Sequence, residues 1–266
     1  MSEPTSNTPD TDATTSKPEI DYGPSNPWWT CMAPMIAFLL IGLFEPAAPV
    51  TDPALAATKS GGLAALFGIT YEHYPYVYAV RLVVTAILLW RVWPSICAWM
   101  GKASWWPPVL GVALTVPWVW LSVLQRDGKW LSGDTGRVGF NPFEVFDGQE
   151  PWKIWTYIAI RGLGLVVIVP IVEELFLRGF LLRFVVKEKF WTVPFGVIDT
   201  VVLAVCALYA VGSHPAEAAA ALAWFGAVTW IAWKTRQPID TITVHAATNL
   251  ALGIYVVMTP GMWWLL

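Results

Sequence analysis

Long apolar runs, each close to the length that an α-helix needs to cross a bilayer, dominate the chain from residue 28 onward. A hydrocarbon core about 30 Å thick requires about 20 apolar residues in a helix. The runs span residues 28–44, 76–100, 105–124, 154–186, 191–212, 216–233 and 239–258. We therefore expect an all-α, polytopic membrane helical bundle with about seven to eight transmembrane helices. An eighth helix would lie in the Pro-rich segment 45–75 or within the long fourth run.

The composition agrees with a membrane protein and excludes other classes. Hydrophobic residues make up 56% of the chain and charged residues 13%, whereas an ordinary soluble domain has about 25% charged residues. The 18 Trp residues are typical of membrane–water interfaces, where an amphipathic ring meets both environments. The net charge of −3 leaves no basic surplus to neutralise phosphates, so we expect the lipid bilayer, and no nucleic acid, as a partner.

Polarity divides the chain into three regions. Residues 1–27 are rich in Ser, Thr, Asp and Pro, and we expect a disordered polar tail there. Residues 28–150 hold N-terminal transmembrane helices and loops, and residues 151–266 hold the helices that carry the motifs below. Nine Lys and Arg residues fall on the N-terminal side of the expected bundle and five on the opposite side. The positive-inside rule then predicts a cytoplasmic N-terminus in an integral, multi-pass membrane protein.

Ionisable residues inside the apolar runs are the candidates for function, because Asp, Lys or Arg at the centre of a membrane helix costs about 2.5–3.5 kcal/mol. The strongest cluster is Glu173, Glu174 and Arg178. Glu174 and Arg178 are four residues apart, so they share a helix face and can neutralise each other. Glu173 points about 100° away and has no local cation. A carboxylate in such a poorly solvated site is suited to general acid–base work.

A second candidate group consists of His245, Asn249 and His214. His245 and Asn249 are again four residues apart, and both side chains can donate hydrogen bonds to an oxygen that gains negative charge. Thr248 lies on a neighbouring face and can bond back to its own helix. His214 directly precedes Pro215, which places it at a helix junction near one membrane face.

Structural roles and other functions compete with catalysis. The Glu–Arg pair would serve as a packing lock, and the His–Asn pair as a hydrogen bond between helices. Arg161 and Asp199 we interpret as structural, either paired with each other or facing water. Intramembrane carboxylates and histidines also form the proton relays of proton-coupled carriers. A non-catalytic scaffold or immunity protein of the same fold would carry the same residues.

The motif Glu173-Glu174-xxx-Arg178, a following His, and the motif His245-xxx-Asn249 resemble the CPBP family of intramembrane proteases, which includes the type II CAAX prenyl endopeptidases. The core of the resemblance covers residues 160–255. Further segments, from residue 32 onward, resemble the CAAX-protease-related proteins of bacterial PEP-CTERM and exosortase sorting systems.

One position departs from the family pattern, which has Phe four residues before the second-motif His. Here Ala210 stands at that position before His214, and Tyr209 comes one residue earlier. Either the aromatic residue has slipped by one position, or His214 is not the motif residue.

The resemblance implies a peptide hydrolase. Glu173, helped by His214, would activate a water for attack on a peptide carbonyl. His245 and Asn249 would stabilise the oxyanion, while Glu174 and Arg178 would orient the helix. A zinc-dependent version would use Glu173, His214 and His245 as ligands; we favour the glutamate-activated water without a cofactor. The substrate would be a membrane-associated protein or peptide with either a lipidated C-terminus or a hydrophobic C-terminal anchor.

Overall fold

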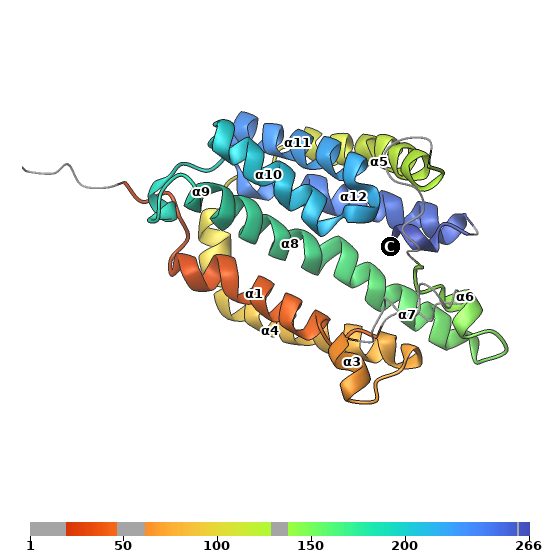
Figure 1. Cartoon of the computed structure of the whole chain (residues 1–266). Helices are drawn as coiled ribbons and strands as arrows, with labels where there is room; N and C mark the ends of the chain where they lie inside the picture. The colour runs from red at the N-terminus through yellow and green to blue at the C-terminus, as the bar shows by residue number, and fades with distance from the viewer. Residues whose placement is uncertain (1–19, 47–61, 129–137, 260) are drawn as a thin grey trace, which may run out of the picture.

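A computed structural model describes residues 20–46, 62–128, 138–259 and 261–266, which form helices and the turns between them (Figure 1). The expected all-α fold is confirmed. The longer helices are α1 (Pro27–Gly42), α4 (Tyr74–Trp99), α5 (Trp106–Arg126), α10 (Thr200–Ser213), α11 (Ala218–Thr235) and α12 (Pro238–Met258), and the short ones include α3 (Gly62–Leu66) and α6 (Pro142–Val145). Proline occupies the first turn of α1, α4, α5 and α12, where its missing N–H costs nothing.

The fourth apolar run forms one continuous helix. Helix α7 (Pro151–Leu163) leads into the π-helical segment η2 (Gly164–Ile168), then α8 (Val169–Glu174), the π-helical η3 (Leu175–Leu181) and α9 (Leu182–Phe184) without a break. At about 1.5 Å per residue its axis is about 50 Å long, longer than the bilayer core. This run therefore does not hide an eighth helix, and in the described part of segment 45–75 the structure has only the short α3 and one 3₁₀ turn.

The fifth run begins its helix later than expected. The run was predicted from residue 191, but α10 starts at Thr200. Pro194 and a positive φ of 74° at Gly196 interrupt any helix before that point. Asp199 then caps α10, because its side chain accepts a 2.8 Å hydrogen bond from the backbone N–H of Val202. Asp199 thus has a structural role, as predicted, though its hydrogen-bond partner is its own helix.

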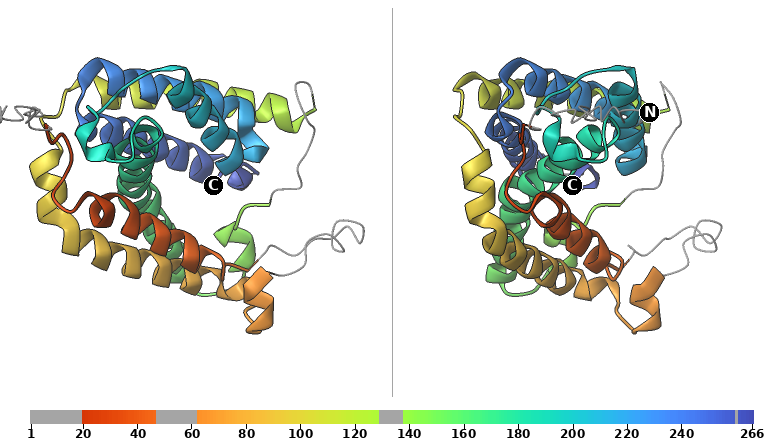
Figure 2. Two further views of the ribbon diagram at one scale, coloured as in Figure 1. Left: turned by 60° about the vertical axis from the view of Figure 1, so that its left-hand side comes forward. Right: turned by 90° about the vertical axis from the view of Figure 1, so that its left-hand side faces the viewer.

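The long helix from Pro151 to Phe184 lies at the centre of the bundle. Helices α1 and α4 pack side by side on one side of it, and α5, α10, α11 and α12 lie on the other (Figures 1 and 2). Successive long helices run in alternate directions between the two ends of the molecule. Helix α12 approaches α5 closely at Gly111, where an added Cβ would lie 2.4 Å from the Val244 carbonyl oxygen.

By length and composition, four helices among the described residues can cross a bilayer: Tyr71–Trp99, Trp106–Arg126, Pro215–Thr235 and Pro238–Met258. Two shorter apolar helices, Pro27–Gly42 and Thr200–Ser213, accompany them. Large apolar side chains on the outer faces, such as Trp90, Trp120 and Leu208, are more than half exposed, as a lipid-facing surface requires. The chain is therefore an integral, multi-pass membrane protein.

The end of the bundle near the N-terminus is held together by Arg183, a fully buried side chain. Its guanidinium donates to the carbonyl oxygens of Val193 (2.8 Å), Gly179 (3.0 Å) and Trp191 (3.2 Å). Tyr22 joins this end through its backbone N–H, 2.8 Å from the Trp191 carbonyl oxygen. Residues 1–19 of the expected tail lie outside the described residues.

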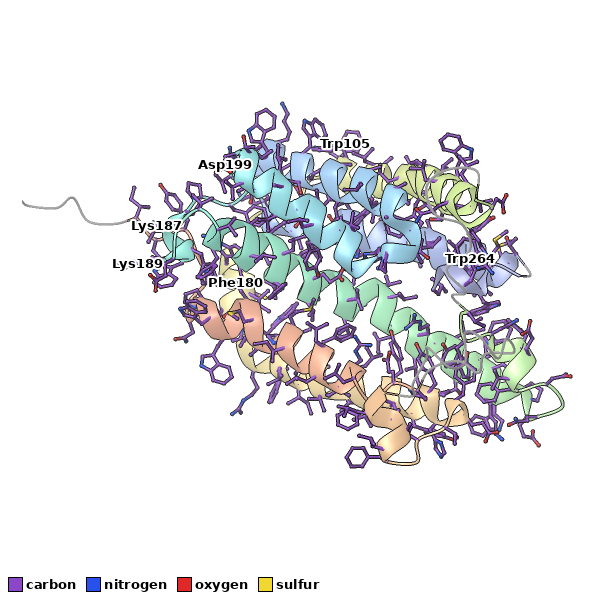
Figure 3. The ribbon with its side chains drawn as sticks, viewed as in Figure 1. Trp105, Phe180, Lys187, Lys189, Asp199 and Trp264 are labelled. Atoms are coloured by element: carbon purple, nitrogen blue, oxygen red, sulfur yellow. The ribbon has the colours of Figure 1, made fainter. Side chains whose placement is uncertain are left out.

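The loop after the long helix brings Lys187, Lys189 and Asp199 to this same end, and Trp264 lies at the other (Figure 3). Arg178 and Arg183 were counted among the charges on this side. Both are buried, and without these two residues the Lys and Arg count becomes seven against five.

Candidate active site

Glu174 and Arg178 form a buried ion pair. Arg178 Nη1 lies 2.6 Å and 2.7 Å from the two carboxylate oxygens of Glu174, and both side chains are almost inaccessible to solvent. The guanidinium also donates to the Phe225 carbonyl oxygen (3.1 Å) and lies 3.4 Å from Thr229 Oγ1, both on α11. The pair therefore ties the long helix to α11, in the i,i+4 arrangement that the sequence predicts.

His245 of α12 faces both glutamates at once. Its Nδ1 lies 3.2 Å from Glu174 Oε1, and its Nε2 lies 3.6 Å from Glu173 Oε2. The ring of Trp224 packs edge-on against the imidazole, with centroids 4.6 Å apart. Because both ring nitrogens are directed at carboxylates, the imidazole is fixed in orientation and connects the paired glutamate to the unpaired one.

Asn249 hydrogen-bonds across to the long helix. Its Nδ2 donates to the Leu165 carbonyl oxygen at 2.8 Å. This carbonyl lies in the π-helical segment η2, where the Val169 N–H bonds to the Gly164 carbonyl oxygen. The residue five positions after Leu165 is Pro170, which has no N–H. The Asn249 amide thus supplies a donor that the local backbone lacks, and its second N–H is left over for a ligand.

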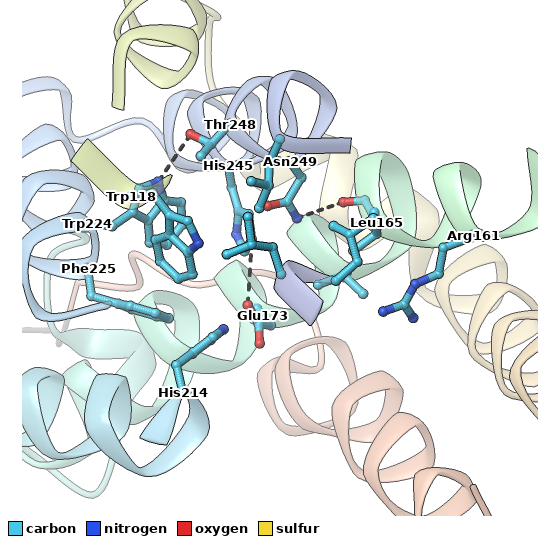
Figure 4. A pocket seen from close by; sticks show the side chains of 14 residues that line it. Trp118, Arg161, Leu165, Glu173, His214, Trp224, Phe225, His245, Thr248 and Asn249 are labelled. Carbon is cyan, nitrogen blue, oxygen red and sulfur yellow. Dashed lines mark hydrogen bonds and ion pairs between the residues drawn. The ribbon is translucent and has the colours of Figure 1, made fainter. Parts of the chain in front are cut away.

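His214 ends α10 and lies across the pocket from His245 (Figure 4). Its Nδ1 is 2.9 Å from the Ser213 hydroxyl. Its ring packs against Trp118 (centroids 5.5 Å apart) and Phe225 (5.6 Å apart). Tyr209 packs against Phe225 as well, at 5.6 Å, while Ala210 is fully buried.

The candidate residues from three separate segments line one pocket of about 140 Å³. Glu173 projects into it, with His214 on one side and His245 and Asn249 on the other (Figure 4). Glu174 and Arg178 do not line this pocket. Its lining also includes two tryptophans, Trp118 from α5 and Trp224 from α11. Sequence reasoning missed both, because tryptophan in an apolar run is typical of membrane interfaces; the sequence carries no signal that separates them from the other Trp residues.

A second pocket of about 280 Å³ adjoins the first. The two pockets share Arg161, Leu165, Asn249 and Leu266 in their linings. The second is otherwise apolar, between the long helix and α12, and includes Ile158, Val166, Leu250 and Ile254. Arg161 lies over the Tyr78 ring at 4.7 Å, and in the described part of the chain it has no carboxylate partner. It is therefore not paired with Asp199, which was one of the two arrangements expected.

Thr248 bonds back to its own helix, as the sequence suggested, and to α5. Its Oγ1 lies 2.9 Å from the carbonyl oxygens of both Val244 and Gly111. It also accepts a 3.1 Å hydrogen bond from the Trp224 indole N–H. Thr248 thus fixes the tryptophan that packs on His245.

The arrangement does not fit the zinc alternative. Among the described residues no group of three His, Cys, Asp or Glu side chains is placed to hold a metal ion.

Residues 154–251 match the family model described as type II CAAX prenyl endopeptidase Rce1-like. The match extends from α7 to α12 and contains Glu173, Glu174, Arg178, His214, His245 and Asn249, whereas α1, α4 and α5 lie outside it. No curated protein and no solved structure is significantly similar to the chain. Residues 154–251 therefore resemble the Rce1-like domain of the type II CAAX prenyl endopeptidases, which are peptide hydrolases.

Proposed function

We propose that the protein is an intramembrane endopeptidase that cleaves a peptide bond near the C-terminus of a membrane-associated protein, with Glu173 as the base that activates water. The observation that carries the proposal is the asymmetry of the two carboxylates. Glu174 is neutralised by Arg178 at 2.6 Å, whereas Glu173 projects into a pocket, with His245 Nε2 3.6 Å from its carboxylate. One carboxylate is thus held in place and its neighbour is left to accept a proton.

The reaction uses one water and needs no other reactant. Glu173 takes a proton from the water, and the oxygen attacks the carbonyl carbon of the scissile peptide bond. The carbonyl π electrons move to the oxygen, which becomes an oxyanion. When the tetrahedral intermediate collapses, the C–N bond breaks and the proton held by Glu173 passes to the leaving amine. His214 faces Glu173 across the pocket and assists the proton transfers, and His245 orients the carboxylate.

The two adjoining pockets support a substrate with apolar residues on one side of the scissile bond. The apolar pocket offers about 280 Å³, a volume suited to aliphatic side chains. Arg161 at the shared wall is a cation within the membrane region, where charged residues commonly mark substrate paths. A free C-terminal carboxylate placed a few residues after the scissile bond would pair with it. A lipidated C-terminus and a hydrophobic C-terminal anchor remain the two substrate classes, and the likeness to sorting-system proteins supports the second by sequence only.

A comparison of protein termini tests the function. Host membranes would contain the wild-type protein, Glu173→Gln, or neither, at matched expression levels. We expect new C-terminal cuts in or beside apolar tails with the wild type alone, and these cuts identify the substrate class. Glu173→Gln keeps the shape of the side chain and removes the base. Identical termini in all three membranes, with an abundant mutant protein, would contradict the proposal and make coupled ion flux in liposomes, the signature of a carrier, the next measurement.

We also propose seven transmembrane spans with a cytoplasmic N-terminus, in a bacterial inner membrane. The alternating course of α1, α4, α5, the long helix, α10, α11 and α12 supports this topology (Figure 1), as does the seven-to-five excess of Lys and Arg. Reporter fusions at the two ends should then report opposite sides of the membrane. Reporters on the same side would contradict it.

A further inference from the structure

Among the side chains that line the pocket in the described part of the chain, one buried hydrogen-bond donor has no acceptor. The Trp118 indole Nε1 is buried and has no hydrogen-bond partner among the described residues. Buried donors without partners are rare in native structures and need an explanation, one of which is a ligand that supplies the acceptor. The neighbouring Trp224 shows the usual arrangement, because its indole N–H donates to Thr248 Oγ1 at 3.1 Å.

The position of this donor is fixed by packing. Trp118 lines the same pocket as Glu173. Its ring meets His214 edge-on, with centroids 5.5 Å apart and planes at 89°, and meets Trp224 in the same way at 6.2 Å and 88°. Figure 4 shows the indole nitrogen on the pocket side of the ring, facing the space that Glu173 and His245 also face. The N–H is therefore held toward the place where an attacked carbonyl group would lie.

The other candidate donors in the pocket already serve contacts within the protein, fully for His245 and in part for Asn249. The two His245 nitrogens lie 3.2 Å and 3.6 Å from carboxylate oxygens. The Asn249 amide uses one of its two N–H groups on the Leu165 carbonyl oxygen. An oxyanion is best stabilised by donors that are oriented before the reaction and need no rearrangement, and the Trp118 N–H meets this condition.

We propose that the Trp118 indole N–H binds the carbonyl oxygen of the scissile peptide bond and stabilises the oxyanion that forms on it. This assignment rests on the proposed endopeptidase function. Trp118 belongs to α5, which lies outside the segment that matches the family model. The N-terminal helices therefore contribute a group that touches the reacting atoms.

The test is Trp118→Phe in the purified full-length protein, which removes the N–H and keeps an aromatic ring. The probe is an internally quenched, farnesylated peptide that ends in Cys, two aliphatic residues and Ser. We expect kcat to fall about 10²- to 10³-fold with KM within about twofold of the wild type. The melting temperature should fall only modestly, because the smaller ring leaves a small cavity while no hydrogen bond within the protein is lost. The matched control is Trp120→Phe on the same helix, whose side chain is 61% exposed and whose loss of N–H should leave kcat unchanged.

A binding measurement separates failure of this assignment from failure of the proposed function. In the Glu173→Gln background, ¹⁵N-labelled tryptophan gives indole N–H signals, and the Trp118 signal is the one that disappears in Trp118→Phe. Adding the same peptide should shift that signal downfield. If the wild type does not cleave the peptide, the proposed function fails for this substrate, while a shifted signal still supports the donor. An unmoved signal, or a kcat of Trp118→Phe within twofold of the wild type, would overturn the assignment.

Discussion

The side-chain amide of Asn249 donates a 2.8 Å hydrogen bond to the backbone carbonyl oxygen of Leu165. This contact joins α12 to the long helix about two turns before the candidate catalytic carboxylates. It is required because the π-helical turn directs the Val169 N–H to Gly164 and Pro170 contributes no N–H. Asn249 therefore positions the long helix in addition to any contact with substrate.

Replacing Asn249 by Leu should leave the Leu165 carbonyl oxygen without a donor. We expect a loss of about 1–3 kcal/mol in the free energy of unfolding, measured by denaturant titration in detergent. Pro170→Ala restores a backbone N–H next to this carbonyl. The double variant should therefore recover part of the stability of the single one. No recovery would show that Asn249 does not stabilise the helix through Leu165.

The buried pair of Glu174 and Arg178 predicts a strongly non-additive pair of substitutions. Glu174→Gln and Arg178→Met should each cost about 3–5 kcal/mol of stability, because each leaves the partner charged and buried. The double variant leaves no uncompensated charge and should cost much less than the sum. A double-mutant cycle on the free energy of unfolding measures this coupling. Additive losses would mean that the two charges do not depend on each other.

Substitution of Gln125 tests whether His214 takes part in the reaction. This buried side chain donates to the Pro215 carbonyl oxygen (3.3 Å) and accepts from the Ala219 N–H (3.2 Å), so it holds the turn that follows His214. Gln125→Leu should lower kcat, by less than the factor of about 10²–10⁴ typical of general acid–base groups.

His214→Ala supplies the control for that experiment. If Gln125 acts through His214, adding Gln125→Leu to His214→Ala should lower kcat no further. A full additional loss in the double variant would show that Gln125 acts elsewhere, and an unchanged kcat in His214→Ala would remove His214 from the mechanism.

Much of the fold can be predicted from the sequence, because apolar length and helix-compatible composition are local properties. The Glu174–Arg178 pair can also be predicted from the sequence, since i,i+4 spacing places both residues on one helix face. The start of α10 was not, because Pro194, Gly196 and Asp199 had to outweigh an apolar run. Hydrophobicity does not report where a helix begins when the preceding loop is itself apolar.

The pocket was only partly predictable for a different reason. The motif residues are ionisable or strongly polar, which is rare in a membrane helix, so each can be recognised in the sequence without its neighbours in space. Trp118 and Trp224 are conspicuous only through their neighbours, since 18 tryptophans look alike in sequence. The π-helical turn beside Leu165 depends on a one-residue change of hydrogen-bond register, to which sequence periodicity is insensitive.

Metal removal should not affect the reaction. Because the described residues hold no three-ligand cluster, we expect chelation followed by dialysis to leave kcat/KM unchanged. Loss of activity on chelation and its recovery with Zn²⁺ alone would contradict this expectation.

Arg161 predicts that the enzyme recognises a free C-terminus. Its guanidinium lines both pockets and, within the described residues, contacts the Tyr78 ring and no carboxylate. A hydrogen-bonded charge pair with the substrate carboxylate is worth about 1.5–3 kcal/mol, so Arg161→Gln should lower kcat/KM for the farnesylated peptide about 10- to 100-fold. With the wild-type enzyme, the same peptide with a C-terminal amide should show a kcat/KM lower by a similar factor. Arg161→Gln should not lower the kcat/KM of this amide any further. Arg91→Gln, an exposed position on α4, is the control and should leave both peptides unaffected. Equal losses on the acid and the amide would instead assign Arg161 to packing against Tyr78.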